Sequence, residues 1–137
     1  MKKIYETIIQ AMDELELNYQ RNDEEGIVDA YLRGENAAFQ VRLAAMEDQE
    51  VLYCFAVFPI NVPEDKRTAM SELINAINFD NLIGMLTFDP KDGQLFCRMS
   101  CSVDGGAINT TIVKVALGTV FRTLNDNNTA FIKILAA

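Results

Sequence analysis

The spacing of apolar residues at the start of the chain has the period of a helix. Between residues 2 and 17 they recur every three or four positions, at Ile4, Ile8, Met12 and Leu15. This stripe predicts an amphipathic helix that ends at Asn18. Residues 19–25 are polar, so we expect a connection there, and from Gly26 the pattern becomes that of strands.

The strand pattern is clearest in three runs. Residues 27–32 lead to a turn at Gly34, and residues 39–43 alternate between apolar and polar side chains, which is typical of a half-buried strand. In residues 51–58 both faces are apolar, with Tyr53, Phe55 and Val57 on one of them. A single helix layer covers only one face of a small sheet. The other face therefore needs a second part of the chain or a second molecule.

The remaining elements are read in the same way. Residues 63–78 begin with Pro63 and two acids, carry a helical apolar stripe, and predict a second helix. Residues 84–88 and 94–102 flank turn residues and predict a hairpin. Residues 107–124 predict a helix that is apolar around most of its circumference and is therefore buried on several sides. A short helix is expected over residues 129–137.

This order is α-β-β-β-α-β-β-α with a terminal helical piece. Strands and helices without regular βαβ alternation indicate an α+β fold, with a mostly antiparallel sheet and helices packed on one face. The chain has 137 residues, which suits one domain spanning residues 1–137.

Composition excludes several functions. The net charge is −8, from 12 basic and 20 acidic residues, and there is no histidine. A negative protein is poorly suited to nucleic acid or to an anionic membrane, because both require positive charge facing phosphate. The lack of histidine excludes Ser-His-Asp and Cys-His catalysis and His-ligated zinc. The acids of residues 23–25 and 47–50 are expected to be solvated in turns, so no residue is a candidate for catalysis.

The cysteines offer no chemistry of their own. Cys54, Cys97 and Cys101 lack the spacing of a zinc site or a redox pair, and we interpret them as buried thiols in a reducing compartment. Residues 89–93 lack the acid spacing of a calcium loop. No stretch reaches the roughly 18 apolar residues of a membrane span. We therefore expect a cytoplasmic protein with no metal and no cofactor.

Residues 57–98 contain a series of short motifs. Val62-Pro63-Glu64 starts a helix, Leu73-Ile74-Asn75-Ala76-Ile77-Asn78 ends it, and Gly84 precedes the hairpin Phe88-Asp89-Pro90-Lys91-Asp92-Gly93-Gln94. The series resembles the YbjN family, described as putative bacterial sensory transduction regulators. The order of elements also resembles the fold of type III secretion chaperones, which are small, acidic and usually dimeric. The resemblance brings no agreed catalytic residues.

The leading hypothesis is a non-enzymatic, protein-binding regulator or chaperone-like adaptor that forms a homodimer and binds an unidentified protein, with no nucleic acid or membrane partner. Large exposed apolar patches are rare on monomers, so the two most apolar elements are candidates for a partner or dimer surface. Its residues are Tyr53, Phe55, Val57, Leu117, Phe121 and Leu124. An open sheet edge could also accept an extended partner segment.

Two other functions remain open from the sequence. One is a small-ligand or signal sensor with an apolar pocket between helices and sheet. Its candidate lining residues are Met12, Met70, Met85 and Met99, which core packing also explains. An enzyme is the least favoured.

Overall fold

The computed structural model describes residues 2–104 and 107–137. Its elements in chain order are α1 (Lys3–Glu14), β1 (Gln20–Asn22), β2 (Ile27–Arg33), β3 (Ala38–Met46), β4 (Val51–Val57), a 3-10 turn (Glu64–Lys66), α2 (Arg67–Asp80), β5 (Met85–Phe88), β6 (Leu95–Ser102), α3 (Thr110–Asp126) and α4 (Asn128–Leu135). The strands form one sheet in the order β1-β2-β3-β4-β6-β5, and every neighbouring pair is antiparallel.

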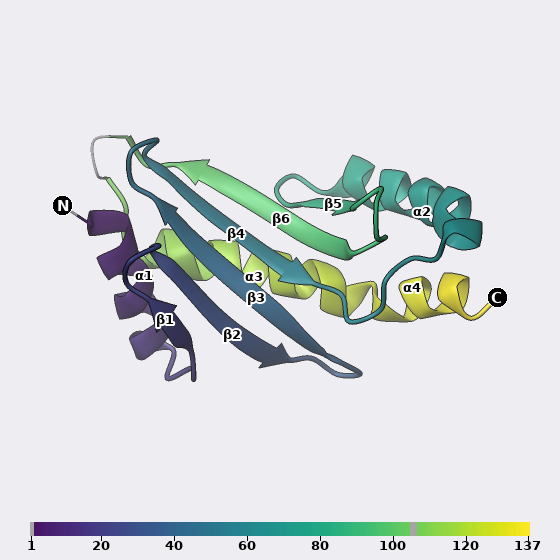
Figure 1. Cartoon of the computed structure of the whole chain (residues 1–137), viewed down its shortest axis with the longest axis horizontal. Coiled ribbons are helices and arrows are strands. Elements are labelled where there is room, and N and C mark those ends of the chain that lie inside the picture. Colours follow the sequence, from purple (N-terminus) through teal and green to yellow (C-terminus); the bar gives the residue numbers. More distant parts are fainter. Residues whose placement is uncertain (1, 105–106) are drawn as a thin grey trace.

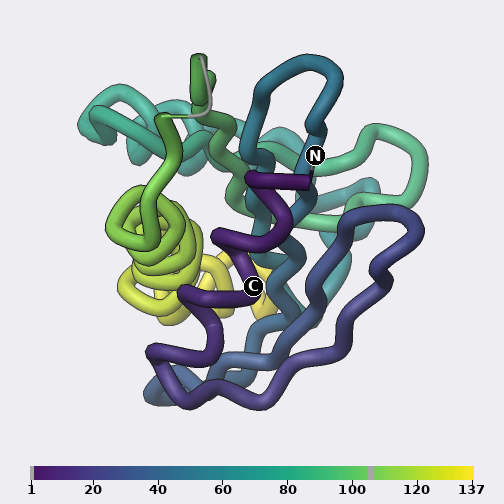
Figure 2. The backbone as a smooth tube through the Cα atoms, turned by 90° about the vertical axis from the view of Figure 1, so that its left-hand side faces the viewer, coloured from purple at the N-terminus to yellow at the C-terminus, as the bar shows by residue number. Residues whose placement is uncertain are grey.

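The helices confirm the predicted α+β class. Helices α1 and α3 pack against each other and against the central strands. They lie behind the sheet in Figure 1, and Figure 2 shows α3 almost end-on along one side of it. No helix of the described residues crosses the front of the sheet (Figure 1).

The polar stretch after the first helix contains a strand that the sequence analysis missed. Residues Gln20–Asn22 pair with Ile27–Asp29, and all three are exposed. Because neither face of this short edge strand is buried, it shows no apolar alternation from which it could be recognised. The hairpin is closed at Gly26, whose φ of +70° favours glycine.

The core lies between the sheet and the helices. Inward-facing side chains of β3, β4 and β6 alternate with partly exposed ones on the other face. Near the C-terminal end of β4, the Phe58 ring lies 5.2 Å from the Phe131 ring and 6.2 Å from the Phe39 ring, measured between centroids. These fully buried rings hold α4 against the strand ends.

Two side chains fix the helices to the sheet. The Glu47 carboxylate, in the turn after β3, accepts hydrogen bonds from the backbone N–H groups of Ile4 and Tyr5 at 3.1 and 2.9 Å. These N–H groups lie in the first turn of α1, where an intrahelical partner is absent. At the other edge, the Asn78 side chain of α2 bonds both to the N–H and to the C=O of Leu86 in β5.

Candidate protein-binding surface

The face of the sheet without helices carries a compact aromatic group on β4 and β6. Tyr53 and Phe55 have ring centroids 5.5 Å apart, and Phe96 lies 6.0 Å from Phe55. Val57 continues the same face, because it is the register partner of Phe96. All four are partly exposed, whereas the alternate residues of β4 are buried. We call this surface the helix-free face.

The other three predicted surface residues lie elsewhere. Leu117 and Leu124 of α3 are 4% and 0% exposed and belong to the core. Phe121 packs edge-on against Phe39, with ring centroids 5.9 Å apart. All three are on the opposite side of the sheet from the helix-free face. In this structure the six predicted residues therefore do not form one surface. The apolar side of α3 packs against the sheet of its own chain.

Two arginines beside Phe55 give this part of the helix-free face positive charge. The register partners of Phe55 are Arg42 on β3 and Arg98 on β6, so arginines flank the ring on both sides. Arg42 pairs with Asp29 through two bonds of 2.8 and 3.0 Å, which raises the pKa of its guanidinium. Arg98 is exposed and forms no ion pair within residues 2–104 and 107–137.

Arg33 continues the alternation of β2 onto the same face. The helix-free face thus holds three arginines and one aspartate on β2, β3 and β6, in a chain with a net charge of −8. A surface of this kind attracts groups that combine apolar and acidic character.

A groove of about 660 Å³ adjoins this face where β5 is too short to cover β6. It is lined by Tyr53, Asn78, Asn81, Leu82, Ile83, Gly84, Met85, Arg98, Met99 and Ser100. Leu82 is 99% exposed, and Ile83 and Met85 are about half exposed. We call it the β6 groove.

The β6 groove also exposes strand backbone. β5 pairs with Leu95–Arg98, and no other described strand pairs with Met99–Ser102 on that side. Since Val103 donates its N–H to Glu50 on the β4 side, alternation turns the backbone groups of Ser100 and Ser102 towards the groove. Unpaired strand groups of this kind can pair with another chain.

We next consider reactive side chains and metal ligands among the described residues. They hold no cluster of three or more potential metal ligands. Burial raises the pKa of the Cys54 thiol, and it raises the pKa of the Cys97 thiol to about 11, so both stay protonated at neutral pH. In this part of the chain no helix is long and apolar enough to span a membrane.

The predicted methionine-lined pocket did not form. Met12 and Met70 are fully buried in the core, where their side chains are packed. Met85 and Met99 both line the β6 groove, which is open rather than enclosed between helices and sheet. Helical periodicity places a methionine on a buried face, but it cannot distinguish a packed position from a cavity wall.

A single six-stranded antiparallel sheet with helices on one face defines an α+β protein whose fold is similar to that of secretion chaperones. Residues 5–133 match the YbjN family, described as "Putative bacterial sensory transduction regulator", and the chain belongs to this family. The resemblance noted in the sequence is therefore confirmed. Among curated proteins, none matches the sequence of this chain.

Solved structures share the fold. The crystal structure of YbjN, "a putative transcription regulator from E. coli", has a TM-score of 0.64 and 14% identity, with 92% of each chain covered. A chain of the HopA1-SchA chaperone-effector complex has a TM-score of 0.59 and 14% identity, with 88% of each chain covered. A chain of the ExsC-ExsE complex has a TM-score of 0.60 and 16% identity, covering 91% of this chain and 90% of the other.

Proposed function

We propose that this protein is a non-enzymatic, cytoplasmic regulator or chaperone-like adaptor that acts as a homodimer and binds a protein partner through the helix-free face. The observation that carries the proposal is the group Tyr53, Phe55 and Phe96, which no described helix covers. Two of the structurally similar chains come from complexes with another protein, which supports a binding role.

The arginines indicate the chemistry of the partner. A partner segment with alternating apolar and acidic side chains would place its apolar groups on Phe55 and its carboxylates beside Arg42 and Arg98. Arg98 has no competing ion pair among the described residues, so a carboxylate there gains a charge-assisted hydrogen bond. A phosphate-rich partner is disfavoured by the net charge of −8, and a strongly basic segment is disfavoured at this face by its three arginines.

The β6 groove gives such a segment a backbone to pair with. An extended segment beside Met99–Ser102 would continue the line of β5 and bond to Ser100 and Ser102. Its side chains would alternate between the two faces of the sheet, beside the exposed Leu82 and Ile83 of the groove. Main-chain bonds supply affinity in this mode of recognition, and the side-chain pockets supply specificity.

The experiment is an affinity pull-down from lysate of the source cell, read by quantitative mass spectrometry. The variant Phe55→Ser removes the central ring, and Arg98→Glu reverses the unpaired charge. Val115→Ser is the control, because Val115 is exposed on α3, on the other side of the sheet. Wild type and control should recover one stoichiometric partner that both test variants lose. Equal recovery by Phe55→Ser and wild type, with native folding shown by circular dichroism, would overturn the proposed surface.

The oligomeric state is tested separately by sedimentation velocity. A homodimer predicts a species of twice the chain mass at micromolar concentration. A strict monomer at high micromolar concentration would refute the dimer and leave the partner surface untouched. Loss of the dimer in Phe55→Ser alone would show that the helix-free face is covered by a second copy rather than by another protein.

A further inference from the structure

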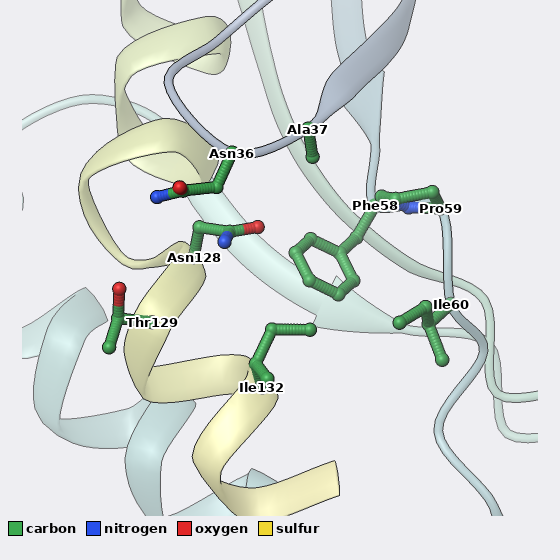
Figure 3. Close-up of a pocket in the computed structure, with 8 residues that line it drawn as sticks. All are labelled: Asn36, Ala37, Phe58, Pro59, Ile60, Asn128, Thr129 and Ile132. Carbon is green, nitrogen blue, oxygen red and sulfur yellow. The ribbon is translucent and has the colours of Figure 1, made fainter. Parts of the chain in front are cut away.

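A second pocket lies at the other end of the sheet, beside α4, and we call it the α4 pocket. It has a volume of about 450 Å³, within the range of roughly 300–1,000 Å³ typical of ligand sites. Three segments form it: the turn between β2 and β3, the residues after β4, and the first turns of α4. Figure 3 shows the Phe58 ring on one side of the pocket, with Asn128 facing it from α4.

The α4 pocket contains a polar atom without a partner. Asn128 is only 7% exposed, and its Oδ1 is buried without a hydrogen-bond partner in the described part of the chain. In Figure 3 this oxygen points towards the side of the pocket occupied by Phe58. A buried acceptor without a hydrogen bond is energetically unfavourable, so a bound molecule that donates a hydrogen bond to it lowers the free energy of the complex.

The remaining wall is neutral and mostly apolar, with Asn36 and Thr129 as its two other polar residues. Ile60 and Ile132 are 44% and 38% exposed, and Figure 3 shows their side chains directed towards each other across the pocket. No residue that lines the pocket is charged. An apolar body would bury both isoleucines, whereas a charged molecule would lose hydration without gaining an ion pair.

The walls are held in place before any ligand binds. Asn125, near the end of α3, accepts a hydrogen bond from the backbone N–H of Glu35 at 2.9 Å, which fixes the β2–β3 turn to the helix. Phe58 is locked between Phe39 and Phe131. A preformed site does not lose binding energy in ordering its own loops.

We propose that the α4 pocket binds a neutral, apolar molecule of one or two rings that donates one hydrogen bond to Oδ1 of Asn128. The apolar body covers Ile60 and Ile132, and the donor satisfies the buried oxygen. This site is separate from the helix-free face, so the proposal stands independently of the partner described above.

The test uses indole as the probe and 1-methylindole as its match, because the two share the same ring system and the methyl group replaces the N–H donor. Both are titrated into the 15N-labelled protein and followed by NMR. Indole should give saturable shift changes at Ala37, Ile60 and Ile132, and 1-methylindole should bind roughly tenfold more weakly. Absence of saturable shifts at these residues, or equal affinity for the two probes, overturns the proposal.

Three variants assign the effect to Asn128. Asn128→Leu removes the acceptor and should abolish the preference for indole. Asn128→Asp keeps an acceptor oxygen and should retain it. Asn75→Leu makes the same replacement at an exposed position of α2 and should bind both probes as wild type does. An unchanged preference for indole in Asn128→Leu contradicts the role of this oxygen, whatever the partner-binding experiments show.

Discussion

Removal of the Asn78 side chain tests how the β5 edge of the sheet is held. Its amide donates to the C=O of Leu86 at 3.0 Å and accepts from the Leu86 N–H at 2.9 Å, so it takes the place of a neighbouring strand. Each such bond contributes about 0.5–1.5 kcal/mol net. Asn78→Ala should therefore lower the free energy of unfolding by about 2 kcal/mol.

The matched control is Asn75→Ala, on an exposed position of the same helix. Both substitutions gain the same helix propensity, so the difference between them isolates the two bonds to Leu86. The free energies of unfolding come from urea denaturation. Native-state hydrogen exchange adds a local readout, because the Leu86 amide should exchange at least tenfold faster in Asn78→Ala. Equal stability of the two variants, together with unchanged protection of Leu86, would refute the reasoning.

Three further predictions concern stability. Glu47→Ala should lower the free energy of unfolding by about 1 kcal/mol, because it leaves two backbone N–H groups of α1 without an acceptor. Asp48→Ala, at an exposed position of the same turn, is the control and should leave thermal denaturation unchanged. The pKa of Cys97 rises from 9.0 to about 11 on folding. Because the thiolate is disfavoured only in the folded protein, the contribution of Cys97 to the free energy of unfolding is fully present below pH 9 and falls by about 1.4 kcal/mol by pH 10. This part of the loss should vanish in Cys97→Ala, as measured by urea denaturation at pH 8 and pH 10. Gly93→Ala should lower the free energy of unfolding by more than about 2 kcal/mol, since φ is +78° and an added Cβ would clash with the Val62 carbonyl oxygen. A urea midpoint like that of wild type would contradict this.

Most of the fold could be predicted because its elements bury one side. The alternation of residues 39–43 and the stripe of residues 63–78 both reflect contact with the core. The first is found within β3, and the second is found as a 3-10 turn followed by α2, which begins at Arg67 and ends at Asp80. The exception is β1, whose three residues are all exposed and so carry no burial signal. The two hydrogen bonds from Asn78 to Leu86 could not be predicted either, since asparagine is also common at the C-terminal end of a helix without such bonds.

The candidate surface shows the same limit from another side. Hydrophobic periodicity reports that a face is covered, but it does not identify the covering group. For Leu117 and Leu124 the cover is the sheet of the same chain, which leaves both almost fully buried. For Tyr53 and Phe55 no described helix supplies it, although the sequence signal is equally apolar. To tell the covered residues of α3 from the uncovered residues of β4, one needs the position of every helix relative to the sheet, and that position depends on long-range packing. The apolar strand could therefore be recognised from the sequence as needing a cover on both faces, but only the arrangement of α1 and α3 on a single side identifies the face that lacks a helix.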